Sequence, residues 1–184
     1  HFTRAILNDL KEKGVHVREL TLHVGAGTFR PVKAETIGDH DMHTEHLVIS
    51  RELVEQLKEK TGDIVAVGTT SVRTLESLYW MGVKRLAGQE DFFTLGQWEA
   101  YTLPQDYSLR EAMEALCGWF DTACQELLKA RTTIIIVPGY RYRVIDAMFT
   151  NFHQPQSTLL LLVGAAVGED WHKIYDYALT HDFR

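Results

Sequence analysis

Short apolar runs, rich in β-branched residues, alternate along the chain with longer segments that begin at helix-capping residues. Strands are predicted at residues 15–24, 47–49, 64–67, 134–137 and 141–150. Helices are predicted after the caps Thr3 and Ser50, from the capping box at Ser108 to about Ala130, from Ser157 or Thr158, and over residues 72–80 and 171–178. Strands that alternate with helices predict an α/β fold with a largely parallel sheet.

Length and charge narrow the class of protein. A chain of 184 residues is expected to form one domain. Its 19 Lys and Arg against 25 Asp and Glu give a net charge of −6, which excludes a generally basic nucleic-acid-binding surface but leaves room for a local basic patch. The longest apolar run, residues 159–167, is too short to cross a bilayer, and no signal peptide opens the chain.

The cysteines and the chain ends carry two further expectations. Cys117 and Cys124 lie seven residues apart in a predicted helix, roughly 10 Å along its axis, which is too far for a disulfide. Free cysteines without an export signal predict a cytoplasmic location. Because the sequence begins at His1 without a methionine, we expect a piece of a longer protein.

A glycine-rich loop follows the first predicted strand. Gly25 and Gly27 allow close approach of the backbone to a ligand, and Thr28 and Phe29 follow them. The loop lacks the third glycine of a dinucleotide fingerprint, and no helix follows directly. A ligand-binding loop and a tight turn without a ligand both fit this pattern.

A histidine-rich loop occupies residues 39–46. His40, His43 and His46 recur every third residue among three carboxylates, which fits a metal site, a metal-free polar binding loop or a solvated loop. The spacing does not match the HExxH helix motif. A histidine beside a carboxylate, such as His43 beside Glu45, can act as a general base near neutral pH.

A third loop joins the strand at residues 64–67 to a helix. It contains Gly68 and the hydroxyl residues Thr69, Thr70 and Ser71. Free N–H groups at such a helix N-terminus favour a carboxylate or phosphate, and Arg73 could add a bidentate contact. The alternative is that Ser71 simply caps the helix while Arg73 and Glu76 pair on its surface. Without a GK[ST] element, a Walker-type nucleotide site is excluded.

A similar strand–helix junction recurs near the C-terminus. It contains the polar residues Asn151, His153, Ser157 and Thr158. Ligands of α/β sheets gather beyond the carboxyl ends of strands. We therefore expect one pocket to be lined by His40, His43, Thr69, Thr70, Arg73, Asn151 and His153.

Five motifs occur in one order, and together they resemble a known family. They are residues 23–32, 40–45, 67–77, Pro138-Gly139-Tyr140 and residues 150–160. The series resembles the S-adenosylmethionine:tRNA ribosyltransferase-isomerases of queuosine biosynthesis over most of residues 1–86 and 134–184. The resemblance implies transfer and isomerisation of the ribosyl group of S-adenosylmethionine onto 7-aminomethyl-7-deazaguanine at the tRNA wobble position. Epoxyqueuosine, adenine and methionine are the implied products.

The resemblance also implies a domain organisation and partners. Residues 1–184 correspond to the C-terminal part of an α/β catalytic domain with a largely parallel or mixed, barrel-like sheet and flanking helices. The family's inserted β-barrel domain lies outside this chain, and residues 87–132 form a helical insertion. We expect the isolated piece to be inactive. The implied partners are the tRNA anticodon loop, S-adenosylmethionine as ribosyl donor, the rest of the same protein and a further subunit if the protein is oligomeric. Neither a metal ion nor a membrane is expected as a partner.

The matched motifs carry the expected site residues. The catalytic set is His40, His43, Glu45 and His153. The substrate-binding set is Gly25, Gly27, Thr28, Phe29, Thr69, Thr70, Ser71, Arg73, Glu76, Tyr140, Asn151, Phe152, Ser157 and Thr158. By their chemistry, His43 or His40 would remove a proton next to the sulfonium, and His153 or Asn151 would assist the departing adenine.

Several features keep other functions open. Gln154 stands where the family has leucine, and residues 164–166 replace a bulkier set, which fits a divergent member with a different acceptor. A metal-dependent hydrolase would use His40, His43 and His46. A non-catalytic binding module is the third possibility. For tRNA contacts, the local candidates are Arg141, Tyr142 and Arg143.

Overall fold

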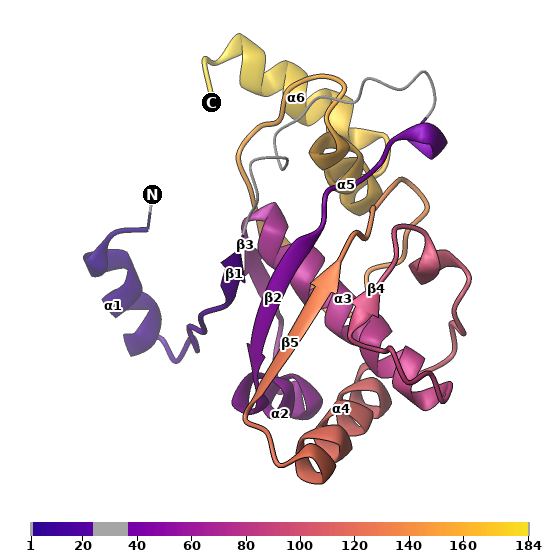
Figure 1. The fold of residues 1–184 in the computed structure, drawn as a ribbon. Helices are drawn as coiled ribbons and strands as arrows, with labels where there is room; N and C mark the ends of the chain where they lie inside the picture. Colours follow the sequence, from indigo (N-terminus) through magenta and orange to yellow (C-terminus); the bar gives the residue numbers. More distant parts are fainter. Residues whose placement is uncertain (1, 24–36, 184) are drawn as a thin grey trace.

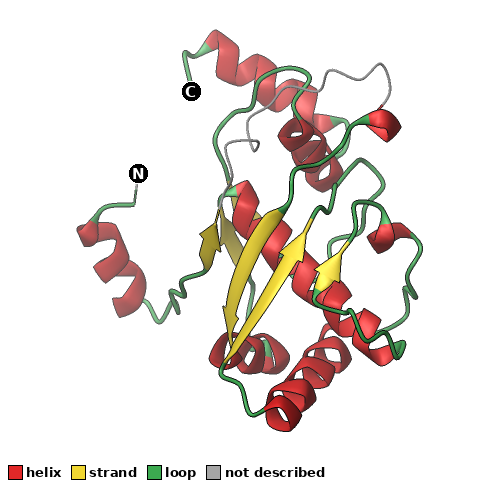
Figure 2. Cartoon of the chain, in the orientation of Figure 1, coloured by secondary structure: helices red, strands yellow, loops and turns green. Residues whose placement is uncertain are grey.

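The computed structural model describes residues 2–23 and 37–183, and within them helices and strands alternate (Figures 1 and 2). The α-helices are α1 (Arg4–Glu12), α2 (Arg51–Glu59), α3 (Thr69–Leu86), α4 (Leu109–Ala123), α5 (Thr158–Val167) and α6 (Asp170–Thr180). The strands are β1 (Thr21–His23), β2 (Glu45–Ser50), β3 (Val65–Val67), β4 (Thr94–Leu95), β5 (Leu127–Thr132) and β6 (Ala147–Phe149). Two short 3₁₀ turns cover Ile37–Asp39 and Glu99–Tyr101.

The strands form two small sheets of mixed direction. In the larger sheet, with order β1-β2-β5-β4, β2 is antiparallel to both neighbours and β4 runs parallel to β5. In the smaller sheet, β3 and β6 are parallel, with Val67 opposite Phe149. The α/β prediction is confirmed, and the sheet is of the mixed kind because β1, β2 and β5 are joined as antiparallel neighbours.

Helix α3 is the centre of the core and passes behind β2 and β5 in Figure 1. From Val72 to Lys84 every residue of this helix is buried. The inward residues of β2 alternate with exposed ones, so Glu45, Leu47 and Ile49 face the core. Their partners on β5, Thr132, Ala130 and Leu128, are buried as well.

Helix α4 packs closely against α3. A Cβ atom at Gly82 of α3 would lie 2.3 Å from the carbonyl oxygen of Ala112 on α4, so the contact requires glycine. The capping box predicted at Ser108 is confirmed, with Glu111 as its partner. The caps predicted at Thr3 and Ser50 are also confirmed, and Ser157 is the residue that caps α5.

Three sequence predictions about these elements are wrong, and the strands predicted at residues 15–24 and 141–150 are shortened to β1 and β6 in the described residues. The helix after Ser108 ends at Cys124, which adopts a left-handed conformation with φ of 52°, and the period-two pattern of residues 127–132 then forms β5. Residues 134–137 form no strand: Ile134–Ile136 are buried, but their backbone groups bond to Arg73, Gln97 and Tyr101. The third concerns β3.

Strand β3 was expected to be buried on both faces. Instead Val65 and Val67 are 47% and 52% exposed, and only Ala66 between them is buried. Val65 and Val67 point to the same face of the sheet, which the described residues leave open, and Ala66 points to the other, buried face. Helix α1 is likewise uncovered, with no buried residue. Within the described ranges, no helix has both the length and the apolar character needed to cross a bilayer.

Candidate functional site

Three charged or titratable side chains from two separate motifs meet inside the fold. Arg73 Nη1 lies 2.8 Å from Glu45 Oε1, and His43 Nε2 lies 3.3 Å from the same oxygen. The Arg73 Nη1–His43 Nε2 distance is 3.4 Å. The His43, Glu45 and Arg73 side chains are 19%, 1% and 3% exposed. Only His43 therefore faces the outside of this cluster.

The secondary structure explains this meeting. Glu45 is the first residue of β2 and points to the core side because Leu47 and Ile49 do so at period two. Arg73 lies one turn into α3, on the same core side, and its Nε donates to the carbonyl oxygen of Ile134 at 3.1 Å. The cluster is thus fixed by β2, α3 and the irregular segment after β5.

Burial sets the electrostatics of the cluster. Burial lowers the pKa of Arg73, and the neighbouring Glu45 carboxylate opposes that effect. Among the described residues, Glu45 Oε2 and Arg73 Nη2 are buried without a hydrogen-bond partner. Buried polar groups ordinarily have partners, so the free acceptor and donor of this ion pair can bond a further polar group.

The N-terminus of α3 lies close by and has no side-chain cap. Gly68 is its N-cap, with φ of 92°, a conformation that favours glycine. The predicted cap, Ser71, instead donates from Oγ to the Val67 carbonyl oxygen at 2.9 Å. Thr69 is buried and Thr70 half-buried. The first N–H groups of α3 therefore have neither an intrahelical acceptor nor a cap within the described chain.

The two strand–helix junctions are neighbours. Strands β3 and β6 are parallel, and the Gly68 N–H donates to the Phe149 carbonyl oxygen at 2.8 Å. The loop that begins at Thr150 therefore leaves the sheet beside the N-terminus of α3. The structure brings these two junctions together, as the sequence pattern predicts for parallel strands.

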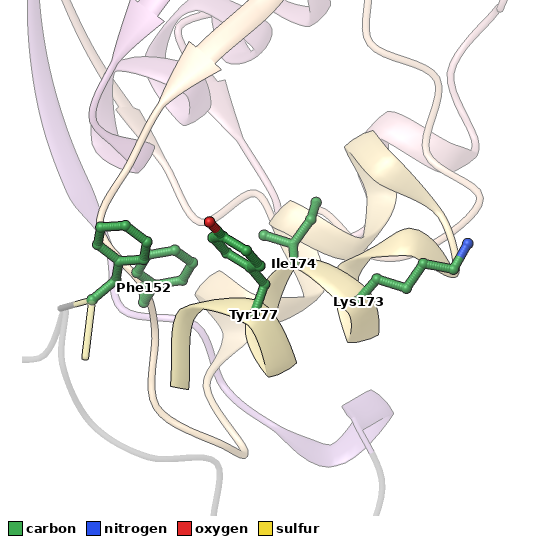
Figure 3. Close-up of a pocket in the computed structure, with 5 residues that line it drawn as sticks. Phe152, Lys173, Ile174 and Tyr177 are labelled. Carbon is green, nitrogen blue, oxygen red and sulfur yellow. The ribbon is translucent and has the colours of Figure 1, made fainter. Parts of the chain in front are cut away.

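His153 and Phe152 occupy the second junction. His153 Nε2 lies 2.7 Å from Thr150 Oγ1, its backbone N–H donates to Tyr175, and burial lowers its pKa. Phe152 borders an open hollow of about 550 Å³ with Lys173, Ile174, Tyr177 and Phe183 (Figure 3). Asn151 is exposed beside them.

Several expected site residues have structural roles instead. Glu76 is fully buried and accepts four hydrogen bonds, from the Tyr140 hydroxyl and the N–H groups of residues 143–145. Burial raises the pKa of Glu76, against the opposing effect of those hydrogen bonds. Tyr140 also accepts from Trp80 Nε1. The alternative of a surface Arg73–Glu76 pair is therefore wrong, because both residues are buried with other partners.

Other expected site residues are also held by contacts within the protein, or lie outside the described residues. Ser157 Oγ accepts the Leu159 N–H as a helix cap, and Thr158 is buried at the start of α5. Arg143 lies over the rings of Tyr79 and Trp80 and bonds Gln105, so its guanidinium is held against the protein. Gly25, Gly27, Thr28 and Phe29 lie outside the described residues.

The three-histidine grouping is not formed. His46 follows Glu45 on β2 and therefore points to the opposite, exposed side of the sheet, whereas His43 contacts Glu45 on the core side. His40 is half-buried. In residues 2–23 and 37–183, no three His, Cys, Asp or Glu side chains gather closely enough to hold a metal ion.

One contributor was missed by the sequence reasoning. Gln97 lies in the segment at residues 87–132, outside the matched motifs, yet its side chain bonds the backbone on both sides of Asp41. A lone glutamine in a turn-rich stretch carries no motif, so only the fold reveals it.

Fold and site together define a class: an α/β protein with a polar cluster and an uncapped helix N-terminus at the carboxyl ends of parallel strands. Residues 1–184 match the sequence model of the queuosine biosynthesis protein family, and the chain belongs to that family.

Two relatives give the measure of this likeness. The S-adenosylmethionine:tRNA ribosyltransferase-isomerase of Rickettsia bellii (strain OSU 85-389) is 38% identical over 188 residues, which cover 100% of this chain and 42% of that protein. A crystal structure of the S-adenosylmethionine tRNA ribosyltransferase of Thermotoga maritima is 30% identical with a TM-score of 0.59, covering 98% of this chain and 45% of that one. The chain thus spans less than half the length of these relatives.

Proposed function

We propose that the protein containing this chain transfers and isomerises the ribosyl group of S-adenosylmethionine onto 7-aminomethyl-7-deazaguanine at the tRNA wobble position, releasing adenine and methionine. Membership of the queuosine biosynthesis family supports the reaction class. The observation that carries the proposal is the buried contact of His43, Glu45 and Arg73, which joins two family-like motifs into one site. The proposed product on the tRNA is epoxyqueuosine.

His43 is the proposed base. The ribose carbon bonded to the sulfonium is acidic, and the reaction needs a group that removes its proton. His43 is the exposed member of the cluster, and Glu45 holds its ring and stabilises the imidazolium that forms. Glu45 Oε1 contacts both the His43 ring and Arg73, so the proposed role of Glu45 is positioning.

The methionine carboxylate is assigned to the N-terminus of α3. Uncapped N–H groups at residues 69–71 favour an anion there, and the partial positive charge of the helix end adds to the attraction. One turn further on, Arg73 Nη2 is a buried donor without a partner among the described residues. Thr69 and Thr70 supply hydroxyl groups at the same turn.

Adenine departure is assigned to the second junction. Burial lowers the pKa of His153 and so favours the neutral ring, which can donate a ring N–H to a purine nitrogen. Asn151 is the alternative donor. The Phe152 ring, in its apolar hollow, offers a flat surface for a base (Figure 3).

The tRNA contact requires local groups, since the chain carries a net charge of −6. Arg141 is exposed and is the remaining cation of the proposed Arg141–Arg143 patch. Residues 1–184 are proposed to be the C-terminal part of the catalytic domain, with residues 87–132 as an insertion and the rest of the protein supplying further tRNA contacts. Both cysteines are free, which fits a cytoplasmic location.

A second candidate keeps the same donor but changes the acceptor. Gln154 is exposed at the second junction, where the family resemblance leads us to expect leucine. A polar side chain there fits a different base or a different RNA. The metal-dependent hydrolase is disfavoured, because His46 faces away from His43.

The test uses the full-length gene product with S-adenosylmethionine and tRNA that carries 7-aminomethyl-7-deazaguanine. We expect adenine and methionine in equal amounts, together with epoxyqueuosine in the tRNA. Residues 1–184 alone are expected to be inactive. Adenine release only with another acceptor would favour the second candidate, and no release with any tRNA would contradict the proposal.

A further inference from the structure

The side chain of Gln97 links the segment after β4 to the backbone of the histidine loop. Its Nε2 donates to the His40 carbonyl oxygen at 2.7 Å, and its Oε1 accepts the Met42 N–H at 2.9 Å. The amide therefore bonds both sides of Asp41, as a neighbouring β-strand would. His43, the proposed base, follows directly after the second of these bonds.

The backbone of Gln97 is tied to the other side of the site. The Ile135 N–H donates to the Gln97 carbonyl oxygen at 3.2 Å, and the preceding Ile134 carbonyl oxygen accepts from Arg73 Nε at 3.1 Å. Arg73 in turn contacts Glu45 and His43. Hydrogen bonds thus form a closed ring from Gln97 through Ile134 and Arg73 to the histidine loop and back.

The turn that carries Gln97 is itself anchored to α3. Lys84 is buried and donates from Nζ to the Thr94 carbonyl oxygen at 2.6 Å and to Glu99 Oε1 at 2.9 Å. Glu99 Oε2 accepts the Gly96 N–H. The turn on which Gln97 sits is therefore held at both ends and can impose a position on the loop that it binds.

We propose that Gln97 is a positioning residue that holds His40–His43 in register with Glu45 and Arg73. The proposal rests on the function proposed above, because it assigns the base to this loop. It also gives the segment at residues 87–132, which lies outside the matched motifs, a part in the active site. A loop displaced by about 1 Å can cost on the order of 100-fold in rate, so the effect should appear in kcat.

The test compares Gln97→Leu with Gln105→Leu in the full-length protein. Gln105 is a matched control in the same segment, because its Nε2 also donates to backbone carbonyl oxygens, those of Ala100 and Leu103, and its Oε1 accepts from Arg143 rather than from the histidine loop. For Gln97→Leu we expect kcat to fall about 10- to 100-fold while KM for S-adenosylmethionine changes less than about threefold. For Gln105→Leu we expect a lower melting temperature with kcat retained.

Two further readouts separate positioning from general destabilisation. Gln97→Glu keeps the acceptor for Met42 but turns a carboxylate oxygen toward the His40 carbonyl oxygen, so its kcat should fall at least as far as that of Gln97→Leu. Hydrogen exchange of the Met42 amide should quicken in Gln97→Leu and stay slow in Gln105→Leu, whether or not the protein turns over.

The outcomes distinguish the two proposals. Wild-type turnover with unchanged kcat in Gln97→Leu would overturn the positioning role. Equal losses of kcat in the Gln97 and Gln105 variants, in proportion to melting temperature, would also overturn it. No turnover in the wild type would instead contradict the proposed function, and unchanged Met42 exchange would contradict the contact itself.

Discussion

Breaking the buried Glu45–Arg73 pair on one side should cost far more stability than removing it on both sides. The two groups lie 2.8 Å apart with side chains 1% and 3% exposed, so neither charge can be solvated alone. Removal of one partner of such a pair typically costs about 3–5 kcal/mol. Replacement of both by neutral groups of similar size removes the uncompensated charge, so most of that loss should be recovered.

The assay is a double-mutant cycle by urea unfolding of the full-length protein, followed by tryptophan fluorescence. We expect Glu45→Gln and Arg73→Met each to lower the free energy of unfolding by about 3 kcal/mol. The double variant should be no less stable than either single variant, which gives a coupling of at least about 3 kcal/mol. None of the three variants should retain turnover, because the site needs both groups.

A surface pair provides the control for this cycle. Lys173 Nζ and Asp170 Oδ1 are 2.7 Å apart, but their side chains are 83% and 64% exposed. The cycle with Lys173→Met and Asp170→Asn should give a coupling below about 1 kcal/mol. Additive losses at Glu45 and Arg73, or a coupling no larger than the surface control, would refute the reasoning that burial makes this pair interdependent.

Three further predictions follow from particular contacts. Burial lowers the pKa of His153, so its contribution to stability is present above the ordinary imidazole pKa and is lost as pH falls through the lowered pKa of the folded state. The variant His153→Gln should therefore lose less melting temperature than the wild type as pH falls below about 6.5. An unchanged slope of melting temperature against pH would contradict this. Gly82→Ala should lower the free energy of unfolding by about 1–3 kcal/mol, because the added Cβ clashes with Ala112. The control Gly118→Ala on α4 has open space around the added Cβ and should be neutral or stabilising by up to about 1 kcal/mol. Similar melting temperatures for the two variants would count against the close helix contact. Glu76→Gln should lower the free energy of unfolding in urea by about 1–3 kcal/mol, because an NH₂ group then faces N–H donors. A loss of turnover without a loss of stability would instead indicate that Glu76 contacts the substrate.

Local signals in the sequence predicted the helices well. Thr3, Ser50 and Ser108 mark helix starts because a cap acts through hydrogen bonds within three residues. The end of the helix after Ser108 was missed, because Leu127 and Leu128 fit a helical face as well as a strand. These residues form a strand rather than a helix because they pair with β2, which lies about 80 positions earlier in the chain.

The candidate site was predicted in part. The spacing of the motifs pointed to His43, Glu45 and Arg73, since each occurs in a series of matched residues. The buried state of Arg73 and the structural roles of Glu76 and Tyr140 could not be read from spacing, because they depend on how residues 134–145 pack against α3. Gln97 was missed for the same reason: its partners are backbone groups 55 and 57 positions away.

The most direct measurement concerns the proton next to the sulfonium. S-adenosylmethionine labelled with tritium at that ribose carbon is incubated with the full-length protein and its tRNA, and tritium release into water is measured beside adenine release. His43→Gln should lower both by at least about 100-fold, whereas His46→Gln, on the opposite side of β2, should leave both unchanged. Equal tritium release from the wild type and His43→Gln would contradict the assignment of His43 as the base.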